Sequence, residues 1–90
     1  MKVVLFKAWS NLDKCWTYHL DIEEPSIWSQ WLWYGIGSAL KNKKVNLYPY
    51  PPFKTEQKIK ILKSYKGERF SATWYGEQIG KTILKDMGQK

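Results

Sequence analysis

The first part of the fold is decided by the stretch Cys15-Trp16-Thr17-Tyr18-His19-Leu20-Asp21-Ile22. Its even-numbered residues are apolar and its odd-numbered residues are small or polar, which is the period of two typical of a strand with one buried face. Residues 3–9 form a second apolar run, in which Val4, Phe6 and Ala8 are expected to share the buried face. The mostly polar residues 10–14 between the two runs are typical of a turn. We therefore predict an N-terminal β-hairpin over residues 2–22.

A helix is predicted over residues 25–41, directly after the hairpin. Proline fits the first position of a helix, and the carboxylates of Glu23 and Glu24 before Pro25 favour the positive end of the helix dipole. At about 100° per residue, the apolar side of this helix is expected to hold Ile27, Trp28, Trp31, Leu32, Gly35 and Ala39. The sequence Gly35-Ile36-Gly37 is interpreted as a place where the helix packs closely against a neighbour.

Trp33 falls among polar residues on the other side of this predicted helix. An exposed tryptophan presents a large apolar surface to water, and such residues are often anchors of interfaces. Trp33 is therefore predicted either to bind a partner or to be covered by a neighbouring element, for instance the proline-rich segment. The tryptophans expected in the core are Trp9, Trp16, Trp28 and Trp31.

Residues 45–54 are predicted to form an extended connector. Pro49, Pro51 and Pro52 exclude a helix, because proline lacks the backbone donor and holds the preceding residue extended. One interpretation is an ordered segment whose aromatic side chains pack on the core. The alternative is a polyproline-type ligand for the aromatic groove of another protein.

The last third of the chain, residues 55–90, allows two interpretations. In the favoured one, residues 58–65 and 69–75 form a second hairpin, and a short helix follows over residues 77–87. In the other, three helices over residues 55–88 are arranged in a way that faintly resembles a helix-turn-helix unit. The predicted fold is therefore α+β, a single domain of residues 1–90 with a hairpin at each end of a central helix.

The composition excludes several classes of protein. Cys15 is the only cysteine, so no internal disulfide forms, which favours a reducing, cytoplasmic location. The longest apolar-rich run covers residues 27–40, and a membrane span needs about 20 residues. We therefore expect neither a secreted scaffold nor a membrane protein.

No catalytic, metal or cofactor motif is recognised in the sequence. His19 is the only histidine, and on a strand it would lie about 13 Å from Cys15, too far to share a metal. His19 is expected to be an ordinary surface or hydrogen-bonded histidine. The stretch from Gly76 to Gly80-Lys81-Thr82 has three residues between its glycines, whereas a phosphate-binding loop needs four. We expect no enzyme activity and no cofactor.

The strongest functional feature is a basic segment with aromatic residues between its lysines. The formal net charge is +7, and residues 41–69 carry nine basic residues against two acidic ones. Lysine and arginine release counterions from phosphates, and exposed aromatic rings stack on unpaired bases. The candidate nucleic-acid-binding residues are Lys41, Lys43, Lys44, Lys54, Lys58, Lys60, Lys63, Lys66, Arg69, Tyr48 and Tyr50.

Two functions from different classes are consistent with these features. The first is a non-enzymatic protein that binds nucleic acid, either DNA or RNA, through residues 41–69. The second is a protein-binding module that docks through Trp33, for instance a phage- or virus-encoded inhibitor that docks on a larger host protein or nucleoprotein complex. An acidic host protein is the expected partner in that case. A second copy of the chain, forming a homodimer, is a further candidate partner.

Overall fold

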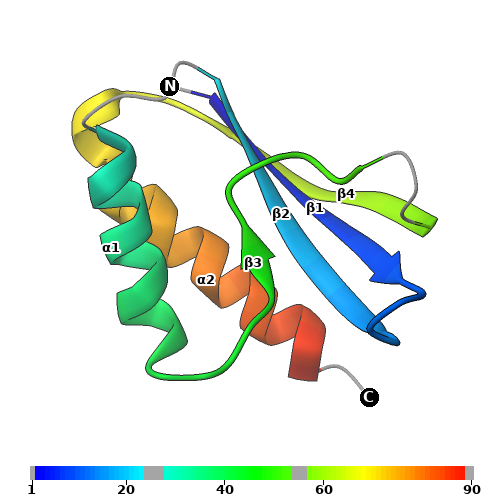
Figure 1. Ribbon diagram of the computed structural model, residues 1–90. Coiled ribbons are helices and arrows are strands. Elements are labelled where there is room, and N and C mark those ends of the chain that lie inside the picture. The colour runs from blue at the N-terminus through cyan, green and yellow to red at the C-terminus, as the bar shows by residue number, and fades with distance from the viewer. Residues whose placement is uncertain (1, 24–27, 54–56, 89–90) are drawn as a thin grey trace. The chain divides into compact units, whose positions relative to one another are not determined.

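The computed structural model describes residues 2–23, 28–53 and 57–88. Its contacts fall into two units, one made of residues 1–23 and 44–66 and the other of residues 24–43 and 67–90. Within the described residues, the first unit is a four-stranded mixed sheet and the second contains two α-helices (Figure 1). The predicted α+β class is confirmed, whereas the assignment of residues 1–90 to one domain stays a prediction.

The predicted N-terminal hairpin is confirmed. Strands β1 (Lys2–Ser10) and β2 (Cys15–Glu23) pair antiparallel and are joined by a turn in which Lys14 has a φ of 57°. Strand β3 (Leu47–Tyr48) runs parallel to β2, and strand β4 (Gln57–Lys66) runs antiparallel to β1. The order across the sheet is β3-β2-β1-β4, so the hairpin is central and β4 is an edge strand (Figure 1).

The two faces of the hairpin are buried differently from the prediction. In β1 the buried residues are Val3, Leu5 and Ala8, while Val4 and Phe6 are only half-buried. In β2 the expected apolar residues Tyr18 and Leu20 are buried, but Thr17 and His19 on the opposite face are buried as well. The reason is that Tyr48 of β3 and Tyr50 in the segment after it lie over the face that carries His19.

The connector prediction is thereby resolved in favour of an ordered segment. Two residues of it form β3, and the Asn46 carbonyl accepts a 2.7 Å hydrogen bond from the Tyr18 amide. The Tyr48, Tyr50 and Phe53 rings follow one another in contact, with centroids 5.5 and 5.3 Å apart. This segment contributes to the first unit.

The predicted strand over residues 69–75 is wrong. These residues form the 3₁₀ turn η1 (Arg69–Ser71) and the first part of helix α2 (Ala72–Gly88). Strand β4, predicted over residues 58–65, exists but pairs with β1 instead. Alternation at residues 70–75 was misleading because the buried residues of α2 recur at helical spacing; they are Ala72, Gly76, Ile79, Gly80 and Ile83. The helix-turn-helix alternative is not supported.

The central helix is confirmed as α1 (Trp28–Leu40), and its predicted start at Pro25 lies outside the described residues. Past its end, Lys41 and Asn42 have φ angles of 48° and 69°, the left-handed conformation that often ends a helix. Among the described residues, no helix combines the length and the hydrophobicity needed to cross a membrane.

Glycines allow α1 and α2 to pack closely. A Cβ atom on Gly35 would overlap the carbonyl oxygen of Thr73, and one on Gly76 would overlap the carbonyl oxygen of Leu32. Along α2, Ala72, Gly76 and Gly80 recur every fourth residue and form a stripe of small residues, a pattern that lets two helix backbones approach. The close packing expected at Gly35 is confirmed, whereas Gly37 has no atom near its would-be Cβ.

We expect Gly76→Ala to destabilise the fold by about 1–3 kcal/mol or more, because the new methyl group must push against the α1 backbone. The matched control is Gly37→Ala, which adds the same methyl group in open space and should stabilise α1 by up to about 1 kcal/mol. Denaturant unfolding of both variants measures the difference. Equal effects of the two substitutions would contradict the packing described for α1 and α2.

Candidate functional site

The predicted nucleic-acid-binding residues are distributed over both units and, within the first unit, over the two edges of the sheet. Lys58, Lys60, Lys63 and Lys66 are exposed on β4, at one edge of the sheet. Tyr48 and Tyr50 belong to the β3 edge, three strand spacings or about 14 Å away. The exposed Lys41 and Lys43 follow α1 and belong to the second unit. The exposed Lys44 is the first residue of the segment 44–66, which belongs to the first unit. Lys54 lies outside the described residues, and Arg69 begins η1.

The register of β1 against β4 sets lysines directly opposite lysines. Lys7 pairs with Lys60, and Lys2 pairs with Lys66. Directly opposed residues have Cβ atoms about 4.5–5.5 Å apart, and like charges in such positions are destabilising. On its other side Lys2 has Glu23 as its neighbour in β2, whereas Lys7 has Tyr18. The register therefore places Lys7 and Lys60 at adjacent positions of β1 and β4.

Two tryptophans lie beside this charge. Trp9 and Trp16 pair across the hairpin, with ring centroids 5.3 Å apart and ring planes at 75°. The Lys7 Nζ lies 4.3 Å from the Trp16 ring centroid, and the Lys58 Nζ lies 5.8 Å from that of Trp9. Both tryptophans are half-buried, so their predicted core position is wrong. We call Lys7, Trp9, Trp16, Lys58 and Lys60 the lysine–tryptophan surface.

An irregularity in β4 contributes to this surface. The register shifts between Lys7 and Trp9, and Lys58, opposite this shift, has a φ of 54°. A side-chain-bearing residue in this left-handed region costs on the order of 1–2 kcal/mol. Bulges of this kind turn a side chain out of the regular alternation. Here the result is that Lys58 lies near the Trp9 ring.

Sequence reasoning missed Lys7, Trp9 and Trp16 as residues of the lysine–tryptophan surface. The lysines of β1 are separated from those of β4 by some fifty positions and belong to a segment with a net negative charge. Only the pairing of β1 with β4 brings them together. The predicted hairpin contained one usable signal, because it already placed Trp9 and Trp16 on either side of its turn.

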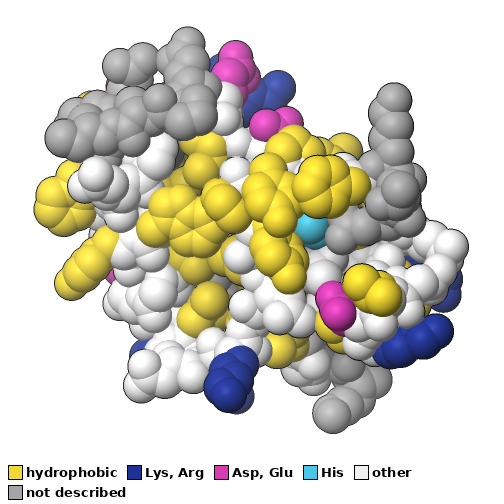
Figure 2. Space-filling model, viewed as in Figure 1, with side chains coloured by type: hydrophobic (Ala, Val, Ile, Leu, Met, Phe, Trp, Pro, Cys, Tyr) yellow, Lys and Arg dark blue, Asp and Glu magenta, His cyan; other side chains and the backbone are white. Residues whose placement is uncertain are grey.

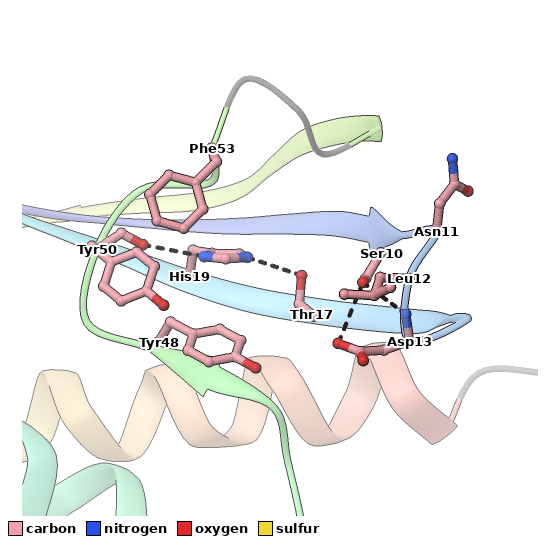
Figure 3. Close-up of a pocket in the computed structure, with 9 residues that line it drawn as sticks. All are labelled: Ser10, Asn11, Leu12, Asp13, Thr17, His19, Tyr48, Tyr50 and Phe53. Carbon is pink, nitrogen blue, oxygen red and sulfur yellow. Dashed lines mark hydrogen bonds between the residues drawn. The ribbon is translucent and has the colours of Figure 1, made fainter.

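An aromatic pocket lies on the other face of the same end of the sheet. Thr17 and His19 point away from the face of Trp16, because successive side chains of a strand alternate. The pocket has a volume of about 420 Å³. Figure 3 shows its lining residues, which are Ser10, Asn11, Leu12, Asp13, Thr17, His19, Tyr48, Tyr50 and Phe53. In Figure 2 the only histidine appears as a small cyan area among hydrophobic side chains.

His19 forms the floor of this pocket and is only 1% exposed. Its ring stacks on Tyr48 at a centroid distance of 5.3 Å. Nδ1 lies 3.2 Å from the carbonyl oxygen of Tyr50, so Nδ1 must carry the proton in that hydrogen bond. Nε2 lies 2.9 Å from the Thr17 hydroxyl, which in turn lies 3.2 Å from the Ala8 carbonyl oxygen. The expected hydrogen-bonded histidine is confirmed, but it is buried rather than at the surface.

We expect Thr17→Val to destabilise the protein by about 1–3 kcal/mol, because a methyl group leaves buried polar atoms of His19 and Ala8 without this partner. Thr17→Ser keeps the hydroxyl and is the matched control, with an expected cost of about 0.8 kcal/mol for the lost methyl group. Denaturant unfolding compares the two. A Thr17→Val variant as stable as Thr17→Ser would contradict the hydrogen-bond network.

The exposure predicted for Trp33 is not observed. Trp33 is half-buried in α1, whereas Trp31 and Tyr34 on the same helix are 52% and 66% exposed. Trp31 was predicted in the core, and this prediction is wrong. The buried side of α1 is rotated by about one residue from the predicted apolar side. The predicted burial of Leu32 and Gly35 is confirmed, and Ile36 is buried beside them.

Among the residues that the structure describes, no group of three or more His, Cys, Asp or Glu side chains is placed to hold a metal ion. Comparison with known proteins gave no match, whether to a family model, to a curated protein or to a solved structure.

Proposed function

We propose that the protein binds single-stranded nucleic acid, DNA or RNA, on the lysine–tryptophan surface. The observation that carries this proposal is the direct opposition of Lys7 and Lys60 in the β1–β4 register. A like-charge pair in this position lowers the stability of the free protein. A phosphate bound near both lysines would replace repulsion between them by attraction, which favours anion binding at this place.

The surrounding residues support a polyanion rather than a single anion. Strand β4 has four lysines and no acidic residue, and Lys2 and Lys7 of β1 bring the number of lysines on this strand pair to six. Their side chains lie on both faces of the strand pair, since β-strand side chains alternate. A flexible phosphate backbone that follows the β4 edge therefore meets lysines along its length.

The tryptophan pair supports an unpaired strand. Trp9 and Trp16 are half-buried, and each has a lysine ammonium group near its ring. Bases of a single strand stack on aromatic rings, while lysines beside the rings neutralise the phosphates. In a duplex the bases are already stacked on one another, so the tryptophans would add little.

Affinity for a labelled single-stranded oligonucleotide should fall by roughly 300-fold between 50 and 200 mM salt if six lysines contact phosphates, from a slope of about 0.7 per contact. Fluorescence anisotropy measures this dependence. The double substitution Lys7→Gln and Lys60→Gln should weaken binding at 50 mM salt and reduce the log–log slope by about 1.4.

The matched control for this experiment is the double substitution Lys81→Gln and Lys85→Gln, which removes the same charge from exposed positions of α2. It should leave the salt slope nearly unchanged. Equal losses in the two double variants would mean that only net charge matters, and the proposed surface would be wrong. Absence of binding at 50 mM salt would exclude nucleic acid and favour a protein partner.

Lys60→Gln is expected to change stability and binding in opposite directions. Removing the charge opposite Lys7 relieves repulsion and should raise the free energy of unfolding by about 0.2–1 kcal/mol at low salt. The gain should shrink as salt screens the pair. Denaturant unfolding at two salt concentrations tests this, and a loss of stability on substitution would contradict the repulsion between Lys7 and Lys60.

The alternative function, a protein-binding module anchored by Trp33, has less support because Trp33 is half-buried. The exposed aromatic residues of the helical unit are instead Trp31, Tyr34, Phe70 and Trp74. A docking partner, whether an acidic host protein or a second copy of the chain, would be proposed for these residues rather than for Trp33.

A further inference from the structure

We propose that the aromatic pocket at the β3 edge is a second binding site, and that it takes a planar nitrogen heterocycle with two adjacent N–H donors, the chemistry of a guanine base. The inference does not depend on the proposed function of the lysine–tryptophan surface. Thr17 and His19 lie on the face of β2 opposite to Trp16, so the two sites use different faces of the sheet.

The wall of the pocket is suited to a flat aromatic ligand. The Tyr48 and Tyr50 rings are inclined by 32°, and the Tyr50 and Phe53 rings by 37°. Tyr50 is 38% exposed and Phe53 is 60% exposed, so these rings present apolar surface to water beside the cavity (Figure 3). A volume of about 420 Å³ lies within the range of small-molecule sites.

The floor of the pocket is held in place by its own hydrogen bonds. His19 bonds the Tyr50 carbonyl through Nδ1 and the Thr17 hydroxyl through Nε2. Both ring nitrogens are therefore engaged within the protein, and the bond from Nδ1 fixes the backbone that carries the Tyr50 ring. Hydrogen bonds to a ligand must come from the rim rather than from the floor.

The β1–β2 turn forms the rim of the pocket, and the Asp13 carboxylate in this turn determines which ligand the pocket prefers. The Asp13 amide donates to the Ser10 Oγ at 3.2 Å, and the Ser10 hydroxyl lies 3.4 Å from the Asp13 Oδ2. A carboxylate has about four acceptor positions, so this contact leaves acceptor capacity for a ligand. Figure 3 shows Asp13 at the mouth of the pocket, across from the aromatic wall.

Guanine fits this rim better than the other bases. Its ring N–H and amino group are adjacent and can donate to both oxygens of one carboxylate, whereas adenine, cytosine and uracil each lack this pair of adjacent donors. The negative charge of Asp13 also disfavours a phosphate at the same place, so the base and not the phosphate is expected to enter. Leu12, which is 92% exposed beside Asp13, would lose contact with water when a ligand binds.

The test is a titration of the isotope-labelled full chain with guanosine, adenosine, cytidine and uridine, followed by amide and aromatic resonances in NMR. These nucleosides carry no phosphate, so lysine binding does not contribute. Guanosine is expected to shift resonances of Asp13, Tyr50 and Phe53 at lower concentration than the other three. A titration with a short oligonucleotide that contains one unpaired guanine distinguishes a free nucleoside from a base within a strand.

Three variants test the assignment of the residues. Tyr50→Ala removes one stacking ring and should weaken guanosine binding by roughly 5- to 150-fold, the loss measured for one base on one aromatic ring. Tyr34→Ala removes an exposed tyrosine of α1 and is the matched control, with no expected change. Asp13→Asn, at an exposed position of the turn, should abolish the preference for guanosine even if Tyr50→Ala does not fold.

The outcomes separate this site from the lysine–tryptophan surface. The double variant with Lys7→Gln and Lys60→Gln should bind guanosine as the unmodified chain does. Pocket resonances that respond to neither guanosine nor the guanine-containing oligonucleotide would overturn the inference, even if the lysines bind nucleic acid. An Asp13→Asn variant that still prefers guanosine would overturn it as well.

Discussion

The antiparallel register between β1 and β4 is the constraint on which the sheet and its charge distribution depend. Strand β1 lies between β2 and β4, so pairing along both of its edges completes the sheet. The same register opposes Lys7 with Lys60 and Lys2 with Lys66, which costs stability. We propose that a bound polyanion neutralises these opposed charges, which links the strand pairing to the proposed function.

The alternation of side chains in the hairpin then separates two sites at one end of the sheet. Trp9 and Trp16 lie on the face that also carries Lys7, and Thr17 lies on the opposite face. The first face combines aromatic rings with positive charge and suits a polyanionic strand. The second has an aromatic wall, a buried histidine and the carboxylate of Asp13, and suits an uncharged heterocycle. The β1–β2 hairpin therefore carries a basic aromatic surface on one face and an aromatic pocket with a carboxylate on the other.

Much of the fold could be predicted from the sequence, because local patterns determined it. The alternation at residues 15–22 correctly indicated the hairpin, and the prolines at 49, 51 and 52 correctly excluded a helix. The strand predicted over residues 69–75 was wrong because residues 70–75 alternate locally, whereas the helix that forms there packs its small residues on α1, a long-range contact that the local pattern does not contain. The site was only half predictable: the lysines of β4 were identified, but Lys7 and the tryptophan pair join them only through long-range register.

The most direct test of the account is a double-mutant cycle on Lys7 and Lys60, each changed to Gln, measured by denaturant unfolding with and without a bound single-stranded oligonucleotide. The account predicts an unfavourable coupling of about 0.2–1 kcal/mol in the free protein. It also predicts that this coupling disappears or becomes favourable when the oligonucleotide is bound, because the phosphates then neutralise both lysines. A coupling of zero in the free protein, or one that the oligonucleotide leaves unchanged, would contradict the account.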